Sequence, residues 1–378
     1  MQERCTDVAS IKIIFAGGGT GGHLFPALAI ADEIKRTDPD AEILFVGTKD
    51  KIESKVVPEA GYKLRTIWIS GFHRSLRMSN LLLPLKMIVS FLQSYLIMRQ
   101  FKPDVVVGTG GYVSGPVLRA AILCRIPTLI HEQNSYPGVT TRLLAPRVTE
   151  VHLTFEKTRK YLSDKSNTFI SGNPTRTSLE AVDKIESLKY FGFSHADNSK
   201  IILVFGGSLG AHSINKAILS ILPELMKKEI KLIWQTGYND LEEIREITKS
   251  YSTEKIWVNA FIDRMDYAYS ASDIVVCRAG ATTIAEITRL GKASILIPYP
   301  HAAANHQVEN ASSLVEAGAA FMVYDNEMKE KLLPTIMKLI NEEQIKIMSL
   351  KSKALGIPEA ATKIAEHIKK LADKHGRK

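Results

Sequence analysis

The fold of this chain is decided by Phe15-Ala16-Gly17-Gly18-Gly19-Thr20-Gly21-Gly22-His23. The apolar run before it, residues 11–15, is typical of a buried strand, and apolar residues at helical spacing follow from 24 to 34. Strand, glycine turn and helix form the first unit of a nucleotide-binding α/β sheet, because glycines let the backbone approach a ligand and a helix N-terminus favours negative groups. The glycine spacing satisfies G-x-G-x-x-G, which is weak evidence alone, and His23 adds a titratable group on the first helical turn.

Strands and helices alternate along both halves of the chain, which predicts parallel sheets covered on both faces. In the first half we expect strands at 11–16, 42–46, 64–69, 105–108, 127–131 and 149–153. The glycine turn recurs at 206–211 after a strand from 200, and further strands are expected at 231–235, 256–258, 274–277 and 294–298. We therefore predict an α/β protein with two Rossmann-like domains facing across a cleft. Their expected bounds are 1–173, with the C-terminal helix 358–378 packed back on it, and 174–357.

The composition is that of a globular chain. Its 378 residues are 45% hydrophobic and 24% charged, and this length suggests two domains. Cys5, Cys124 and Cys277 stand far apart, which fits a reducing compartment and provides neither a disulfide framework nor a zinc signature. We expect no signal peptide and no membrane-spanning segment.

The net charge of +9 is concentrated in one span, residues 60–103, which holds seven Lys or Arg and no Asp or Glu. A local basic excess predicts one anionic contact surface. The same span contains the apolar segment 81–98, in which Leu85, Ile88 and Phe91 recur every third residue. Such spacing places them on one side of a helix, which predicts an apolar face for a membrane interface beside Lys86. A helix packed on the sheet is the alternative.

Two loops of the first half carry polar residues directly after predicted strands. They are 108–116 and 131–134, and in a parallel sheet both would lie at the edge that carries His23. His23 and Glu132 are then candidates for taking a proton from a substrate hydroxyl. Read singly, the first loop is also compatible with a tight turn and the second with a polar strand end.

In the second half, residues 277–286 again end a strand and open a helix. Backbone N–H groups around Gly280 could hold a diphosphate. Glu286 lies about one and a half turns into that helix, within reach of ribose hydroxyls, although a solvated helix residue is the alternative. The segment 300–311 offers several neutral hydrogen-bonding groups, which suit a sugar.

Three other nucleotide sites fail on specific residues. A Walker A loop requires Lys after its last glycine, where His23 stands. An NAD site requires an acid near the end of the second strand, and that strand is followed by Gly47-Thr48, with no acid before Asp50. A metal-dependent transferase would need an acidic pair beside the diphosphate, whereas Asp38-Pro39-Asp40 precedes the second strand at the opposite sheet edge. We therefore expect no metal and no other cofactor.

An ordered set of six motifs resembles the MurG family of bacterial N-acetylglucosaminyltransferases. The motifs stand at 18–23, 110–116, 131–134, 172–174, 206–211 and 307–311 and cover nearly the whole chain. The resemblance implies a type-B glycosyltransferase fold and UDP-N-acetylglucosamine as donor, bound mainly by the C-terminal domain. It implies lipid I (undecaprenyl-diphospho-muramoylpentapeptide) as acceptor, at the membrane face of the N-terminal domain. The implied product, lipid II, carries a β-1,4 bond, so the anomeric centre inverts without a metal.

The resemblance also assigns residues. The expected donor-binding set is Thr20, Gly21, Gly22, Asn134, Arg176, Ser208, Ile262, Arg278, Gly280, Glu286 and Gln307. Within it, Arg176 and Ser208 contact the nucleotide and phosphates, the backbone of Ile262 reads uracil, and Gln307 contacts the sugar. The acceptor set is Thr20, His23, Tyr112 and Asn134, and the membrane-facing set is Leu85, Lys86, Ile88, Phe91 and Ile122. His306 and Leu209 stand where some members carry Gln.

The sequence thus predicts an inverting transferase bound to the cytoplasmic face of the cell membrane. The acceptor C4 hydroxyl would attack the anomeric carbon in line with departing UDP, and His23 or Glu132 would take the proton. The helix N-terminus at Gly280, with Arg176 or Arg278, would offset charge on UDP. The alternatives are another type-B UDP-sugar enzyme, such as a lipid glucosyltransferase or a UDP-N-acetylglucosamine 2-epimerase, and a membrane-binding scaffold with a nucleotide pocket. We expect no nucleic-acid partner.

Overall fold

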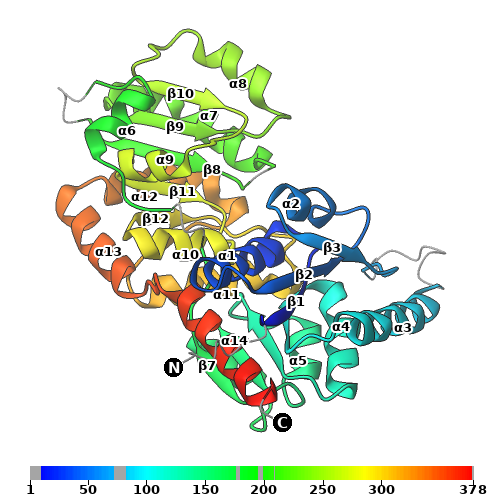
Figure 1. Ribbon diagram of the computed structural model, residues 1–378. Helices are drawn as coiled ribbons and strands as arrows, with labels where there is room; N and C mark the ends of the chain where they lie inside the picture. The colour runs from blue at the N-terminus through cyan, green and yellow to red at the C-terminus, as the bar shows by residue number, and fades with distance from the viewer. Residues whose placement is uncertain (1–9, 72–81, 176–178, 195–198, 208, 377–378) are drawn as a thin grey trace, which may run out of the picture. The chain divides into compact units, whose positions relative to one another are not determined.

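A computed structural model describes residues 10–71, 82–175, 179–194, 199–207 and 209–376 of the chain. The chain forms two compact units, one of residues 1–176 with 358–378 and one of residues 177–357 (Figure 1). Each unit is built on one sheet in which every strand pair is parallel. The predicted α/β class with two Rossmann-like sheets is confirmed.

The sheet of the first unit has seven strands in the order β3-β2-β1-β4-β5-β6-β7. In chain order these are β1 (Lys12–Gly17), β2 (Glu42–Gly47), β3 (Lys63–Thr66), β4 (Val105–Gly110), β5 (Thr128–Glu132), β6 (Glu150–Leu153) and β7 (Thr168–Ile170). Its helices are α1 (Gly21–Thr37), α2 (Glu53–Glu59), α3 (Leu83–Phe101), α4 (Gly111–Leu123), α5 (Val139–Leu144), the 3₁₀ helix η2 (Glu156–Tyr161) and α14 (Ala360–Gly376).

Two apolar cores cover the two faces of this sheet, because successive strand residues point to opposite faces. On one face Phe15 and Phe45 pack against α1 and against Ile364 and Ile368 of α14. On the other face the alternate strand residues pack against α4 and against Met98 of α3. The C-terminal helix therefore completes the first unit, although it follows the second unit in the sequence (Figure 1).

The second unit has a six-stranded sheet in the order β10-β9-β8-β11-β12-β13. Its strands are β8 (Ile201–Phe205), β9 (Lys231–Gln235), β10 (Ile256–Asn259), β11 (Ile274–Cys277), β12 (Ala293–Leu296) and β13 (Phe321–Met322). Its helices are α6 (Lys184–Tyr190), α7 (His212–Lys227), α8 (Leu241–Thr248), α9 (Met265–Ala271), α10 (Ala281–Leu290), α11 (His306–Glu316), α12 (Met328–Leu339) and α13 (Glu342–Ala354), with 3₁₀ helices η3 (Ala303–Asn305) and η4 (Asp325–Glu327).

The predicted strands differ from the structure mainly at the sheet edges. The expected strand 64–69 begins at Lys63 and ends at Thr66, since β3 is an edge strand whose only ladder partner, β2, ends at Gly47. The edge strands β7 and β13 were not predicted. They have three and two residues, too few for a period-two pattern to be recognised.

Candidate active site

The ring of His23 lies against glycine backbone at the carboxyl edge of the first sheet. A Cβ atom on Gly110 would stand 2.5 Å from His23 Cδ2, and one on Gly111 would stand 2.6 Å from the carbonyl oxygen of Gly18. Both glycines also have positive φ, 110° and 75°, which other residues rarely adopt. His23 Nδ1 lies 3.2 Å from Thr20 Oγ1. The start of α4 therefore has to be glycine for the histidine at the start of α1 to take this position.

The glycine turn after β1 is anchored by Glu53, which the sequence analysis did not single out. The Glu53 carboxylate is fully buried, and its Oε2 accepts the Gly19 N–H at 2.9 Å. Its Oε1 accepts the N–H of Thr48 at 3.0 Å and the Thr48 hydroxyl at 2.7 Å. A Cβ atom on Gly18 would stand 2.5 Å from the carboxyl carbon. In the sequence Glu53 resembles any acid in the first turn of a helix, so no local pattern reveals this role.

Tyr112, in the first turn of α4, packs against the same glycine turn after β1. A Cβ atom on Gly19 would lie 3.2 Å from the ring of Tyr112, and one on Gly71 would lie equally close. Burial raises the pKa of the Tyr112 hydroxyl, and the negative charge of Glu53 adds to this. The hydroxyl therefore stays protonated near neutral pH and can donate a hydrogen bond.

Glu132, the second predicted proton acceptor, is engaged in holding its own loop. It is buried at the end of β5, and its Oε1 accepts the N–H of Asn134 at 3.1 Å. Its Oε2 accepts the N–H of Gly138 at 3.0 Å and the hydroxyl of Thr141 at 2.6 Å. A carboxylate with both oxygens committed in this way is poorly placed to take a substrate proton. The structure therefore favours a positioning role for Glu132 and leaves His23 as the better candidate base.

Gln133 ties the loop after β5 to the end of β4. Its side-chain amide donates to the carbonyl of Thr109 at 2.8 Å and lies 3.0 Å from Nδ1 of the buried His131. Burial lowers the pKa of His131 to about 4, so its ring is neutral at pH 7. A neutral ring that accepts at Nδ1 donates from Nε2, which lies 2.9 Å from the carbonyl of Gly172. These bonds fix the loop that presents Asn134.

In the second unit, α10 begins at Ala281 with Gly280 as its N-cap residue. The Thr282 hydroxyl in this first turn is buried and has no hydrogen-bond partner among the described residues. Glu286 lies further along α10, half-buried, and accepts the Tyr269 hydroxyl at 2.9 Å. The helix N-terminus and the unpaired hydroxyl are suited to a phosphate oxygen, and a carboxylate held by a phenol is suited to vicinal hydroxyls.

Arg278, which was predicted to offset charge on UDP, is held by other side chains and by backbone carbonyls in this structure. Its guanidinium is almost buried and pairs with Asp325, which η4 supplies. It also donates to the hydroxyl of Ser213 at 2.8 Å and to the carbonyl of Pro298 at 3.2 Å. These partners satisfy the charge, so Arg278 holds the loop after β12 in place. A sequence reader could not foresee this, because Asp325 is 47 residues away.

Gln235, another residue that the sequence analysis missed, links two predicted donor loops. Its Oε1 accepts the N–H of Ile262 at 2.9 Å, and its Nε2 donates to the carbonyl of Gly207 at 2.8 Å. In this structure the N–H of Ile262, whose backbone is predicted to read uracil, is bonded within the protein. Gln307, the predicted sugar contact, accepts the Tyr299 N–H at 2.9 Å through its own Oε1, which directs its amide nitrogen away from that bond.

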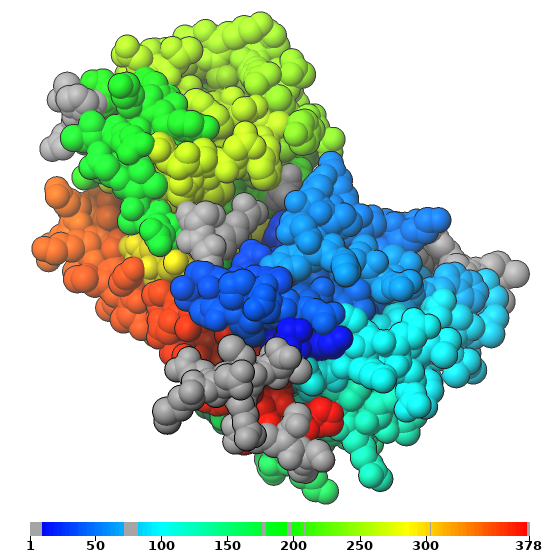
Figure 2. Space-filling view, in the orientation of Figure 1, coloured from blue at the N-terminus to red at the C-terminus, as the bar shows by residue number. Residues whose placement is uncertain are grey.

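The membrane residues predicted on α3 divide into exposed and packed members. Leu85 and Ile88 are 49% and 60% exposed, but Phe91 of α3 and Ile122 of α4 are partly buried against the core. The exposed row continues instead through Leu92 and Leu96 of α3. Met87 of α3 and Leu123 at the end of α4 are further exposed apolar residues outside this row. Figure 2 shows the side chains of α3 (cyan) forming part of the surface.

The row has a polar neighbour in Lys86, whose ammonium group donates to Ser70 at 2.9 Å and lies 5.6 Å from the ring centre of Trp68. We found no helix among the described residues with the length and apolar content needed to cross a bilayer.

Comparison with known proteins identifies the family. The glycosyltransferase family 28 N-terminal domain matches residues 13–153, and its C-terminal domain matches 201–370. A curated relative from Christiangramia forsetii is 42% identical over 96% of this chain and 98% of its own length, and one from Chlorobaculum parvum is 44% identical over 95% and 98%. Both are named UDP-N-acetylglucosamine–N-acetylmuramyl-(pentapeptide) pyrophosphoryl-undecaprenol N-acetylglucosamine transferase. The crystal structure of Acinetobacter baumannii MurG is 29% identical, with a TM-score of 0.76 over 95% of this chain and 99% of that one.

The chain belongs to the MurG family. It is therefore a glycosyltransferase, as the ordered motifs predicted. A UDP-N-acetylglucosamine 2-epimerase from Neisseria meningitidis has a TM-score of 0.65 over 96% of this chain and all of that one, at 16% identity. That likeness concerns the fold alone, and MurG relatives at more than 40% identity favour transfer over the epimerase alternative.

The structure divides the predicted site residues into those of the first unit, those of the second unit and those outside the described residues. The structure brings Thr20, Gly21, Gly22, His23 and Tyr112 together with the loops of Gly110 and Asn134 in the first unit. It brings Gly280 to the N-cap of α10 and Glu286 into that helix in the second unit, with Ile262 on a loop and Gln307 in the first turn of α11. Arg176 and Ser208 lie outside the described residues, as do Arg74 and Arg77 of the basic span.

Proposed function

We propose that this chain transfers N-acetylglucosamine from UDP-N-acetylglucosamine to the C4 hydroxyl of the muramoyl sugar of lipid I, with inversion, to give lipid II for peptidoglycan synthesis. The observation that carries the proposal is the full-length relationship to transferases whose names state this donor and this acceptor. The two glycine-turn sheets and their polar loops support it.

The donor is proposed to bind the second unit. The start of α10 offers backbone N–H groups and the unpaired Thr282 hydroxyl to the diphosphate. Glu286, held by Tyr269, receives the ribose hydroxyls, and Gln307 contacts the sugar. As the bond to the anomeric carbon breaks, the leaving UDP gains negative charge, which the helix N-terminus stabilises. Arg278 contributes by holding its loop rather than by touching the phosphates.

The acceptor is proposed to bind the first unit, with His23 as the general base. The acceptor C4 oxygen forms the new bond to the anomeric carbon on the face opposite UDP, while its proton passes to His23. The contact between His23 Nδ1 and Thr20 Oγ1 positions the ring, so Nε2 is the nitrogen we assign to the proton transfer. Tyr112 and Asn134 contact the acceptor, and Glu132 fixes the loop of Asn134.

We also propose a peripheral location on the cytoplasmic face of the cell membrane. The exposed row of α3 inserts apolar side chains at the interface, and the basic excess of the same stretch of sequence, residues 60–103, attracts anionic headgroups. An acceptor with an undecaprenyl chain requires contact with a membrane, because its lipid stays in the bilayer.

The deciding experiment is transfer of labelled N-acetylglucosamine to a lipid I analogue, followed by identification of the disaccharide product. Donor incubated alone serves as the control, because a 2-epimerase would convert UDP-N-acetylglucosamine without acceptor. Turnover of donor alone, or UDP binding with no transfer to lipid I, would reject the proposal in favour of the epimerase or of the scaffold.

A further inference from the structure

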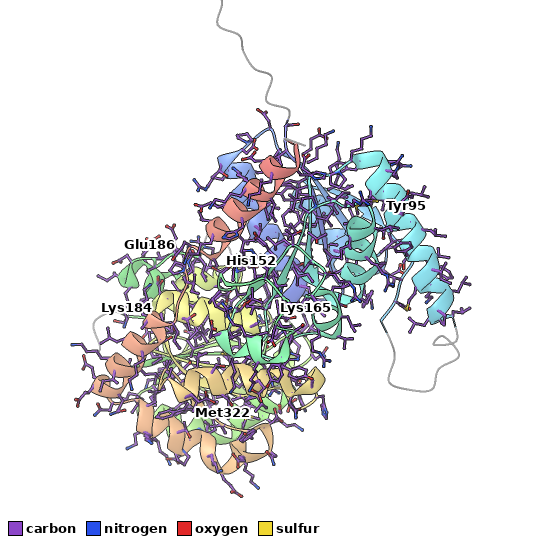
Figure 3. The ribbon with its side chains drawn as sticks, turned by 90° about the horizontal axis from the view of Figure 1, so that it is seen from below. Tyr95, His152, Lys165, Lys184, Glu186 and Met322 are labelled. Carbon is purple, nitrogen blue, oxygen red and sulfur yellow. The ribbon has the colours of Figure 1, made fainter. Side chains whose placement is uncertain are left out.

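Three donor atoms of the kind that bind metals converge beneath α14 in the first unit. Glu150 and His152 are two residues apart in β6 and so lie on the same face of the sheet, while His367 reaches them from α14. Glu150 Oε2 lies 3.1 Å from His152 Nε2 and 2.8 Å from His367 Nδ1. In the part of the chain that the structure describes, this is the one group of three such residues whose donor atoms all lie within 4.8 Å (Figure 3 labels His152).

A serine hydroxyl and a phenylalanine ring contact the imidazole rings of this cluster. His152 is fully buried, and its Nδ1 lies 2.6 Å from the hydroxyl of Ser171. The ring of Phe169 stacks on His152 with 5.3 Å between centroids and meets His367 edge-on at 4.7 Å. A hydrogen bond to the remote nitrogen is the arrangement that orients metal-binding histidines and leaves the other nitrogen for the ion.

We propose that Glu150, His152 and His367 bind a divalent transition-metal ion of the Zn²⁺ class. Two imidazoles and a carboxylate are a common ligand set for such ions. Bond lengths of about 2.0–2.2 Å separate tetrahedral donors by roughly 3.3–3.5 Å. Glu150 Oε2 lies 3.1 Å from His152 Nε2 and 2.8 Å from His367 Nδ1, and all three donor atoms lie within 4.8 Å, so shifts of about half an ångström would give this geometry. Glu150 and His367 retain some exposure, 14% and 27% of their side chains, which gives the ion a path and a water as fourth ligand.

The ion would join α14 to β6, that is, the end of the chain to the sheet of the first unit. Its ligands lie on the sheet face that α14 covers. Glu150 is the first residue of β6, at the opposite strand end from the carboxyl ends that the proposed catalytic loops follow. This inference does not rest on the proposed transfer reaction. Metal binding should stabilise the first unit without being needed for sugar transfer.

The test uses the full chain with no affinity tag, freed of metal by dialysis against a chelator. Zn²⁺ is titrated by calorimetry, and Co²⁺ is added as a spectroscopic probe whose visible absorption reports a tetrahedral site. We expect one equivalent of Zn²⁺ to bind and the melting temperature to rise on addition. His367→Gln and Glu150→Gln should each weaken binding by about 100-fold or more and abolish the melting shift.

His375→Gln is the matched control, because it removes an imidazole from the same helix outside the cluster and should leave binding unchanged. Circular dichroism of each variant separates loss of a ligand from loss of the fold, and Glu150→Gln retains the size of the side chain. Absence of stoichiometric Zn²⁺ binding would overturn the proposal. Binding of equal strength in wild type, His367→Gln and Glu150→Gln would place the ion elsewhere and overturn it as well.

Discussion

The carboxylate of Glu53 accepts the backbone N–H of Gly19 at 2.9 Å, so a residue of α2 fixes the glycine turn that follows β1. The same turn opens α1 and presents Thr20 and His23. A buried carboxylate with three donors directed at it also holds the end of β2 through Thr48. The position of the proposed base therefore depends on a side chain that is 34 residues from the glycine it holds.

Replacing Glu53 with Gln should lower both stability and turnover. The amide keeps the size of the side chain but turns an N–H group toward one of three donors, which leaves a buried donor unsatisfied at a cost of about 1–3 kcal/mol. We expect a lower midpoint of urea unfolding and a reduced kcat, with UDP affinity retained because the proposed donor site lies in the other unit. Glu59→Gln, at the exposed end of α2, is the control. Wild-type kcat and midpoint in Glu53→Gln would contradict the anchoring role.

Replacing His23 with Ala should reduce kcat by roughly 10²–10⁴-fold if the imidazole takes the acceptor proton. UDP affinity should remain close to that of the wild type. Glu132→Gln provides the comparison, because its carboxylate already accepts the Asn134 and Gly138 N–H groups and the Thr141 hydroxyl, and its loss should affect acceptor KM and stability more than the chemical step. Single-turnover rates with both substrates measure the difference. A near-normal rate in His23→Ala would return the proton to Glu132 or to solvent.

Replacing Glu286 with Ala should raise the donor KM well above any change in the acceptor KM. A charge-assisted hydrogen bond to the ribose is worth about 1.5–3 kcal/mol, or roughly ten- to a hundredfold in affinity. Tyr269→Phe removes only the hydroxyl group that orients the carboxylate of Glu286, and it should produce a smaller change in the same direction. Steady-state kinetics with varied UDP-N-acetylglucosamine test both variants. An unchanged donor KM in Glu286→Ala would remove this residue from the donor site.

Sugar transfer should continue after exhaustive treatment with EDTA, since helix N-terminal N–H groups rather than a cation are proposed to stabilise departing UDP. Chelation should lower the melting temperature if the cluster of Glu150 and His367 carries its ion, but the rate below that temperature should not change. Activity lost with EDTA and restored by Mg²⁺ or Mn²⁺ would contradict the proposed mechanism.

The sequence was sufficient for the parts of this structure that depend on local pattern. The glycine turn at 17–22 and the alternation of strands and helices predicted both parallel sheets, because their signals lie within about ten neighbouring residues. The same reasoning placed His23 in the first turn of α1 and Glu286 about one and a half turns into α10. The roles of Glu132 and Arg278 could not be predicted in this way. The partners of Glu132 are near in sequence, but no pattern of residue types shows that the Gly138 N–H and the Thr141 hydroxyl turn toward its carboxylate. The partner of Arg278, Asp325, is 47 residues away and is brought close only in the folded chain.

The division of α3 into packed and exposed residues has the same cause. Spacing alone puts Leu85, Ile88 and Phe91 on one side of a helix, but α3 also packs beside the sheet, and that contact covers Phe91 and Tyr95 (labelled in Figure 3). The exposed row therefore turns toward Leu92 and Leu96, a direction fixed by the position of the core rather than by the helix itself.

Membrane binding should have a part that salt weakens and a part that it does not. Each basic residue near an anionic leaflet contributes about 1 kcal/mol, which fades as salt rises, while buried apolar side chains are not screened. Replacing Ile88 and Leu92 with Ser should reduce the salt-resistant part, because both side chains are more than half exposed, at 60% and 54%. Lys86→Glu should reduce the screened part.

Phe91→Ser is the control for core packing: it should lower the melting temperature and alter vesicle binding less than the exposed pair does. Sedimentation with vesicles containing phosphatidylglycerol, at low and high salt, measures each variant. All variants should keep UDP binding, since the proposed donor site lies in the other unit. Equal sedimentation of wild type, the Ile88 and Leu92 double variant and Lys86→Glu would show that the membrane contact lies outside α3.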